Sequence, residues 1–251
     1  MACPMQRRAS FIGQAAAETL WPARCSLCDT PGNSLCEQCR VQLPYLDALF
    51  ACPRCGAPYG VHLCTECNSY TLEEKGLKRI PLDGCASALV FGPEALRIVI
   101  TYKDRGERDL ARSMGRMMAR AANPAWTGES VAVGIPTRPT ALKRRGFNAS
   151  ELLARAAAEA LGIPYWDALQ ASDVRDQRTL SARQRLQNMA GSMSLKETAR
   201  ADIARMRLSG LPSVVLIDDV MTTGATMYAG AAALRRAGIP HVYGLTFARV
   251  V

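Results

Sequence analysis

The stretch VVLIDDVMTTGATM, residues 214–227, predicts a buried strand, a polar turn and the start of a helix. The apolar run VVLI favours a strand inside a parallel sheet, and it ends at two adjacent carboxylates, Asp218 and Asp219. A turn rich in hydroxyl groups follows, with Gly224 before a helix that we expect to begin near Ala225. Open α/β sheets bind ligands beyond the carboxyl ends of their strands. The stretch therefore predicts both the sheet and the place of its binding site.

The turn carries the groups that a sugar phosphate needs. Its threonines offer hydroxyl donors, its glycine lets the backbone approach a phosphate closely, and the helix N-terminus adds partial positive charge. Two carboxylates fit beside a phosphate if they accept hydrogen bonds from ribose hydroxyls or hold a bridging Mg²⁺ ion. The alternative is a polar turn whose side chains only cap the helix. The phosphate-binding candidates are Thr222, Thr223, Gly224 and Thr226.

The rest of the body has the pattern of an α/β fold. After about residue 86, short β-branched runs alternate with helical stretches, which predicts a parallel sheet with crossover helices. A helix at 149–161 is well marked, because Asn148 and Glu151 suit its start and Gly162 suits its end. A second helix is expected to run to Arg236. The expected strands are residues 88–91, 131–135, 214–217 and 241–247.

Eight of the ten cysteines form four C-x-x-C pairs. Each pair places two thiolates on one side of a tight turn, and two pairs complete a tetrahedral site of four sulfurs, which suits zinc. A closed site of this kind leaves no open coordination position, so we expect two structural zinc ions. Disulfides, a single retained site and a crossed pairing of the turns are the alternatives. The expected ligands are Cys25, Cys28, Cys36, Cys39, Cys52, Cys55, Cys64 and Cys67.

The basic excess of the chain lies outside the cysteine-rich part. Residues 1–75 carry 6 basic and 7 acidic groups, whereas residues 76–251 carry 25 and 15, a balance of +10. Such a surface suits phosphate-rich ligands, from nucleotides to nucleic acid, although it is equally typical of an ordinary solvated face. We therefore predict a double zinc-ribbon domain over residues 1–75 and an α/β domain over residues 76–251.

The sequence predicts no membrane insertion. No apolar run reaches the roughly 18 residues that a spanning helix needs. The segment FIGQAAAETLW, residues 11–21, is too short and polar for the core of a secretion signal. We expect a cytoplasmic protein, in which clustered thiols stay reduced and bind metal.

Residues 214–227 resemble the loop of type I phosphoribosyltransferases that binds 5-phosphoribosyl-1-pyrophosphate (PRPP). The whole chain resembles more narrowly the bacterial ComF family, which is linked to natural competence. That resemblance rests on the paired cysteines, the PRPP loop, YKDRG at 102–106, KRRGFN at 143–148 and the Q-x-x-L-S-x-x-x-R-x-x-N run from Gln177 to Asn188. The chain departs from the family pattern at Thr137, Arg138 and Ala149.

The resemblance implies a type I phosphoribosyltransferase-like sheet with flanking helices behind the zinc ribbons. It also implies that Asp218 and Asp219 contact ribose hydroxyls, that Thr222 to Thr226, Ala225 included, wrap the 5-phosphate, and that Mg²⁺ accompanies PRPP. Arg144 and Arg145 are expected on a loop that follows the strand at 131–135. With Lys103, they are the candidates for catalytic contact with pyrophosphate, or for a nucleic-acid backbone. If the site turns over, the reaction is the transfer of a pentosyl group.

The resemblance further implies partners in DNA uptake. These are incoming single-stranded DNA and competence machinery such as a DNA-translocating helicase. A polar segment at 168–193 resembles the hood that closes over the active site in this superfamily, and it carries Arg175, Arg178, Arg183 and Arg185. The alternatives are a metabolic transferase acting on a base or amine, and a nucleotide-sensing regulator without catalysis.

Overall fold

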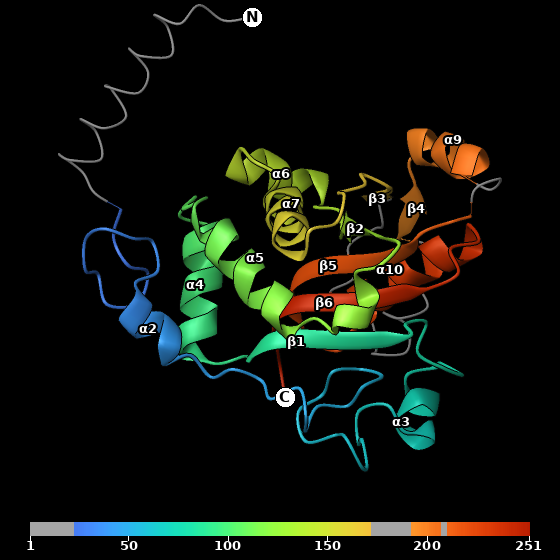
Figure 1. Ribbon diagram of the computed structural model, residues 1–251, viewed down its shortest axis with the longest axis horizontal. Coiled ribbons are helices and arrows are strands. Elements are labelled where there is room, and N and C mark those ends of the chain that lie inside the picture. Colours follow the sequence, from blue (N-terminus) through green and yellow to red (C-terminus); the bar gives the residue numbers. More distant parts are fainter. Residues whose placement is uncertain (1–22, 172–191, 207–209) are drawn as a thin grey trace, which may run out of the picture. The chain divides into compact units, whose positions relative to one another are not determined.

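The computed structural model describes residues 23–171, 192–206 and 210–251 (Figure 1). The chain divides into two compact units, Met1–Leu43 and Pro44–Val251. The larger unit contains the sheet and also the second group of cysteines, so the predicted division at residues 75 and 76 stays a prediction. Within the described residues, no helix is long and apolar enough to cross a membrane.

The larger unit is built on a parallel sheet of four strands in the order β1-β6-β5-β2. The strands are β1 (Gly84–Val90), β2 (Ser130–Gly134), β5 (Ser213–Met221) and β6 (Val242–Arg249). The central strands β5 and β6 are almost wholly buried, as expected for a parallel sheet covered on both faces. The predicted α/β class, a parallel sheet with flanking helices, is confirmed.

Strand β5 is longer than the sequence predicted. The apolar run predicted a strand that ends at Ile217, but pairing with β6 continues from Asp218 opposite Thr246 to Met221 opposite Arg249. The two carboxylates therefore belong to the strand itself and share its hydrogen-bonded backbone. Because successive strand residues point to opposite faces, the two side chains leave the strand in different directions.

Helices cover both faces of this sheet (Figure 1). Helix α5 packs on β1 and β6, and helix α7 packs on β2 and β5. Helix α10 covers β5 and β6 from the other face, where Gly230 meets Leu216. The helices of the larger unit are α3 (Ser69–Glu74), α4 (Pro93–Lys103), α5 (Leu110–Ala121), the 3-10 turn η1 (Pro124–Trp126), α6 (Pro139–Arg145), α7 (Ala149–Leu161), α9 (Glu197–Met206) and α10 (Ala225–Arg236).

The helix boundaries follow the expected local signals. Asn148 Oδ1 accepts a hydrogen bond from the Glu151 N–H at the start of α7, and Gly162 ends that helix with φ of 70°. Helix α10 begins at Ala225, directly after Gly224. Both predicted helices are therefore present.

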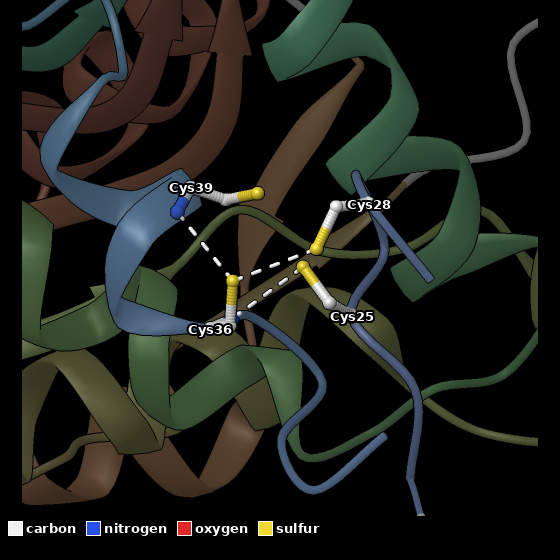
Figure 2. Close-up of side chains that lie close together, drawn as sticks. All are labelled: Cys25, Cys28, Cys36 and Cys39. Carbon is white, nitrogen blue, oxygen red and sulfur yellow. Dashed lines mark hydrogen bonds between the residues drawn. The ribbon is translucent and has the colours of Figure 1, made fainter. Parts of the chain in front are cut away.

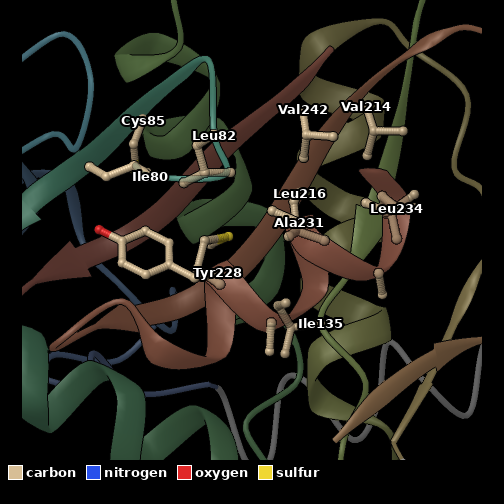
Figure 3. Packing of buried hydrophobic residues seen from close by; sticks show 14 of the residues in the cluster. Ile80, Leu82, Cys85, Ile135, Val214, Leu216, Tyr228, Ala231, Leu234 and Val242 are labelled. Carbon is tan, nitrogen blue, oxygen red and sulfur yellow. The ribbon is translucent and has the colours of Figure 1, made fainter. Parts of the chain in front are cut away.

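The main core lies between the sheet and α10 (Figure 3). Val214, Leu216 and Val242 from the strands and Leu234 from the helix belong to this cluster, and the ring of Tyr228 points toward Cys85 (Figure 3). The same buried cluster includes three ligand candidates of the second cysteine group, Cys52, Cys55 and Cys67. That group is therefore part of the packing of the larger unit.

A short antiparallel pair lies beside the sheet. Strand β3 (Leu169–Ala171) pairs with β4 (Met193–Leu195). The expected hood covers residues 168–193, so β3 lies at its start and β4 begins at its last residue. The rest of that segment, with Arg175, Arg178, Arg183, Arg185 and the run from Gln177 to Asn188, lies outside the described residues.

Candidate functional site

A hollow of about 400 Å³ opens at the carboxyl end of the sheet. Its charged lining residues are on three elements: the last residue of α4, the last residue of α6 and both carboxylates of β5. The first turn of α10 also lines the hollow. The predicted site residues along its walls are Lys103, Arg145, Asp218, Asp219 and Thr226. The fold thus brings together cations and carboxylates that are 73 to 116 positions apart in sequence.

Two lining residues of this hollow, Lys103 and Asp219, form an ion pair. Lys103 Nζ contacts Asp219 Oδ2, and their side chains are only 22% and 10% exposed. Asp218 Oδ1 accepts a hydrogen bond from the Asp219 backbone N–H at 2.9 Å. Lys103 is the last residue of α4, so the helix sets the position of its charge.

The two neighbouring carboxyl groups have opposite electrostatic states. Burial, followed by repulsion from Asp219, raises the pKa of Asp218 well above its ordinary value. Burial also acts to raise the pKa of Asp219, but the charge and hydrogen bond of Lys103 and the hydrogen bond with Asp218 lower it. Asp219 is therefore the carboxylate that carries the negative charge of the pair, and Asp218 is the carboxyl group that keeps its proton to higher pH.

The turn after β5 is shaped by Gly224. Its φ of +81° is in the left-handed region, and a Cβ there would lie 2.7 Å from Tyr228 Cζ and 2.8 Å from Met221 Cε. Thr222 and Thr223 are exposed at the start of α10, and Thr223 Oγ1 accepts from the Ala225 N–H at 3.4 Å. The turn thus presents hydroxyls and a helix N-terminus to solvent, an arrangement that suits a phosphate.

The two candidate arginines lie on a helix, where the sequence predicted a loop. Residues 143–145 form the last turn of α6, whose Pro139 is a favourable first residue and whose end is set by Gly146 with φ of 72°. Arg144 Nη2 and Arg145 Nε lie 3.4 Å and 3.2 Å from Asp104 Oδ1. Arg145 is 15% exposed and lines the hollow, whereas Arg144 is 70% exposed and does not line it.

The first cysteine group gathers four thiols in the small unit (Figure 2). Cys28 Sγ and Cys36 Sγ are 3.6 Å apart, and the Cys36 N–H donates to Cys25 Sγ at 3.4 Å. Cys36 also caps helix α2 (Glu37–Val41), which holds Cys39. Sulfurs bound tetrahedrally to zinc at about 2.3 Å lie roughly 3.8 Å apart, so these thiols fit zinc without large movement.

The second group is Cys52, Cys55, Cys64 and Cys67, in sequence order as predicted. Two of its sulfur separations are 3.6 Å between Cys52 and Cys67 and 3.5 Å between Cys55 and Cys64. The cysteine turns therefore pair in order and are not crossed. Two groups of four thiols in this arrangement are consistent with a double zinc ribbon.

A buried arginine beside the second group supports metal binding there. Arg249 is 3% exposed, and its Nε and Nη1 have no hydrogen-bond partner in the described part of the chain. Burial raises the pKa of Cys55, and the charge of Arg249 acts in the opposite direction. Buried charges are normally compensated. Four thiolates around Zn²⁺ carry two net negative charges, which would compensate the guanidinium.

Curated proteins similar to this chain carry names from DNA use and competence. DNA utilization protein YhgH of Salmonella typhi is 28% identical over 231 residues, which cover 86% of this chain and 92% of that protein. Competence protein F of Haemophilus influenzae is 26% identical, with 84% and 88% covered. Competence protein ComFC of Bacillus subtilis is 24% identical, with 83% and 80% covered. These relatives support the assignment of the chain as a ComF family protein.

No family model matches the chain. Glutamine PRPP amidotransferase from B. subtilis, solved with ADP and GMP, matches with a TM-score of 0.34 at 24% identity, over 53% of this chain and 25% of that enzyme. A structure described as the allosteric regulatory enzyme of purine biosynthesis has the same TM-score and identity. The chain spans about a quarter of the length of each.

The hollow also has a polar wall. Thr137 Oγ1 lies 2.8 Å from Asn148 Oδ1 and 3.0 Å from Ser150 Oγ, and Thr137, Arg138 and Ser150 line the hollow. The resemblance placed Thr137 and Arg138 on the loop expected to meet pyrophosphate, whereas Ser150 was not singled out from the sequence. Thr137 and Arg138 follow β2, which ends at the same edge of the sheet as β5.

Proposed function

We propose that this ComF protein binds PRPP or a related ribose phosphate in the hollow at the carboxyl end of the sheet. The observation that carries the proposal is the meeting of Lys103 and Arg145 with Asp218 and Asp219 beside the N-terminus of α10. We propose further that the protein acts in the cytoplasm and takes part in handling incoming single-stranded DNA during natural competence. The names of its relatives support that role.

Each part of the proposed ligand has a chemical counterpart. Asp218 and Asp219 accept hydrogen bonds from ribose hydroxyls, and the backbone and hydroxyl groups of residues 222–226 hold the 5-phosphate. Lys103 and Arg145 lie where they can neutralise a pyrophosphate. Bound Mg²⁺ would add charge neutralisation between carboxylates and phosphates. Arg144, which is 70% exposed, serves at the rim of the site.

The same groups would favour release of pyrophosphate if the protein is a transferase. Charge develops on the leaving pyrophosphate, so cations held by helix ends stabilise the transition state more than the ground state. Lys103 and Arg145 are each the last residue of their helix, and both are largely shielded from water. We therefore propose Lys103 and Arg145 as the catalytic residues, with Arg144 as a further cation at the rim of the site.

A second candidate function is a metabolic transfer to a base or amine. A hollow of about 230 Å³ adjoins the first and shares Ile135, Pro136 and Thr137 with it. Tyr165 and Gln170 line this smaller hollow and offer a ring and an amide to a flat polar acceptor. Pyrophosphate release from PRPP that depends on an added base would favour this function. PRPP binding without release would favour a nucleotide-sensing regulator.

The experiment that tests the proposal is gene replacement in a naturally competent host. The deletion should lower transformation by linear DNA and leave growth without purines or pyrimidines normal. Asp219→Asn should behave like the deletion, whereas Asp109→Asn should transform normally, because Asp109 is exposed and its side chain makes no capping hydrogen bond. A strain that transforms normally but requires a base would support the metabolic alternative. Normal transformation with Asp219→Asn would show that DNA uptake does not require the ribose-phosphate site.

A further inference from the structure

A second charged hollow lies at the opposite end of the sheet from the ribose-phosphate site. It measures about 550 Å³ and is formed by the segment before β1, the turn between Cys52 and Cys55, and the last turn of α10. Helix α10 has 12 residues, so about 18 Å separate its two ends. An anion in this hollow is therefore distinct from one held at residues 222–226. The cations of this basic groove are Arg54, Lys78, Arg79, Arg235 and Arg236.

One cation of the basic groove has a structural task. Arg235 pairs with Asp83 and donates hydrogen bonds to the carbonyl oxygens of Pro81 and Pro240. Asp83 in turn accepts from the Val242 N–H at 2.8 Å. This network fixes the segment before β1 against α10. Asp83 is the only carboxylate lining the described groove, and it is already engaged.

The other cations leave a surplus of positive charge. Arg54, Lys78 and Arg79 are exposed, and no ion pair to a described carboxylate holds them. Arg236 also lines a neighbouring hollow of about 450 Å³, which contains Arg200. The cations thus line two hollows that share Arg236. Charges spread over two hollows suit a chain of repeated phosphates better than one small phosphate.

The walls between these cations are apolar. Ile80 and Leu82 line the first hollow, and Leu195 and Ile203 line the second. Unpaired bases expose ring faces that stack on aromatic side chains and on the guanidinium planes of arginines, whereas a duplex presents mainly its phosphates. We propose that the basic groove binds the backbone of single-stranded nucleic acid. This inference deepens the proposed role in DNA handling and rests on it, but it does not involve the ribose-phosphate site.

The second cysteine group positions part of this groove. Arg54 lies between Cys52 and Cys55, and the turn closes at Gly56, where a Cβ would lie 2.9 Å from the carbonyl oxygen of Cys85 in β1. Metal bound by these cysteines would hold Arg54 against the sheet. Removal of zinc from this group should therefore weaken nucleic-acid binding.

The test uses fluorescence anisotropy of the full chain with a labelled oligo-dT strand over a range of salt. The variant combines Arg54→Glu, Lys78→Glu and Arg79→Glu. A matched control carries Arg112→Glu, Arg116→Glu and Arg120→Glu, exposed positions on α5 with the same change of charge. We expect the groove variant to bind at least tenfold more weakly than the control. Its slope of log affinity against log salt should fall by about 2, since each lost single-strand phosphate contact contributes about 0.7.

Three outcomes would overturn the inference: equal loss in both variants, unchanged binding in the groove variant, or duplex DNA bound as tightly as the single strand. The triple glutamine variant at the same groove positions should give a smaller loss in the same direction. Calorimetry measures the affinity of the groove variant for PRPP, and so tests the ribose-phosphate site independently of the basic groove. Retained PRPP binding with lost oligo-dT binding supports the groove, whereas lost binding of both ligands would show a general defect and contradict it.

Discussion

The adjacent carboxyl groups of β5 should have opposite effects on stability. Asp219→Asn removes the partner of Lys103, whose side chain is only 22% exposed. Breaking a buried ion pair from one side costs about 3–5 kcal/mol, and the partial exposure of Lys103 favours the lower end, about 3 kcal/mol. Asp218→Asn removes a group whose charged form is disfavoured by burial and by Asp219. That variant should be more stable than the natural protein at neutral pH.

The dependence on pH separates the two effects. The pKa of Asp218 is raised in the folded state, so the natural protein loses stability as pH rises from about 4 to the folded pKa, by about 1.4 kcal/mol per pH unit. Asp218→Asn lacks this loss, and its advantage grows over the same window. The pKa of Asp219 is lowered, so its contribution is present above about pH 4 and disappears as pH falls through the folded pKa.

Urea unfolding followed by tryptophan fluorescence measures both effects. Trp126 is 8% exposed and reports on the larger unit. Zinc-saturated protein is compared between about pH 5.5 and 8, where the thiolates retain metal. Asp109→Asn is the control for an exposed carboxylate. Equal destabilisation by the two variants, or an Asp218→Asn protein less stable than the natural one at neutral pH, would refute the electrostatic assignment.

Three further results are expected. Gly224→Ala should lower the unfolding free energy by about 1–3 kcal/mol in urea titrations and weaken PRPP binding, because its φ of +81° and the contact with Tyr228 exclude a Cβ; unchanged values would contradict the turn geometry. Elemental analysis should find about two zinc ions per chain, and Cys52→Ser should lose one and destabilise the larger unit, whereas Cys28→Ser should lose one without that effect. PRPP affinity should rise with pH up to the folded pKa of Asp218 and then level off, and the Asp218→Asn protein should lack that part of the dependence in calorimetry.

Much of the architecture followed from local signals in the sequence. The apolar run at 214–217 predicted a central strand, and Asn148, Gly162 and Gly224 correctly marked helix boundaries. The spacing of the cysteines predicted two groups in sequence order. These features depend on neighbouring residues, so the sequence contains what is needed to predict them.

Features set by packing between distant segments were missed. Cys52, Cys55 and Cys67 pack in the core of the larger unit, and the spacing of the cysteines carries no signal for that packing. Residues 143–145 were expected on a loop because they follow the strand at 131–135, yet they form the last turn of the seven-residue helix α6, Pro139–Arg145. The Lys103–Asp219 pair joins residues 116 positions apart and had no local signal.

The most direct test of the account is titration calorimetry of PRPP with Mg²⁺ into the full chain. The account predicts one site per chain in the natural protein and in Asp109→Asn. It predicts at least tenfold weaker binding, about 1.4 kcal/mol, when Asp218 and Asp219 are both replaced by Asn. Equal affinity for PRPP in the natural protein and in the double variant would contradict the assignment of a ribose-phosphate site to this end of the sheet.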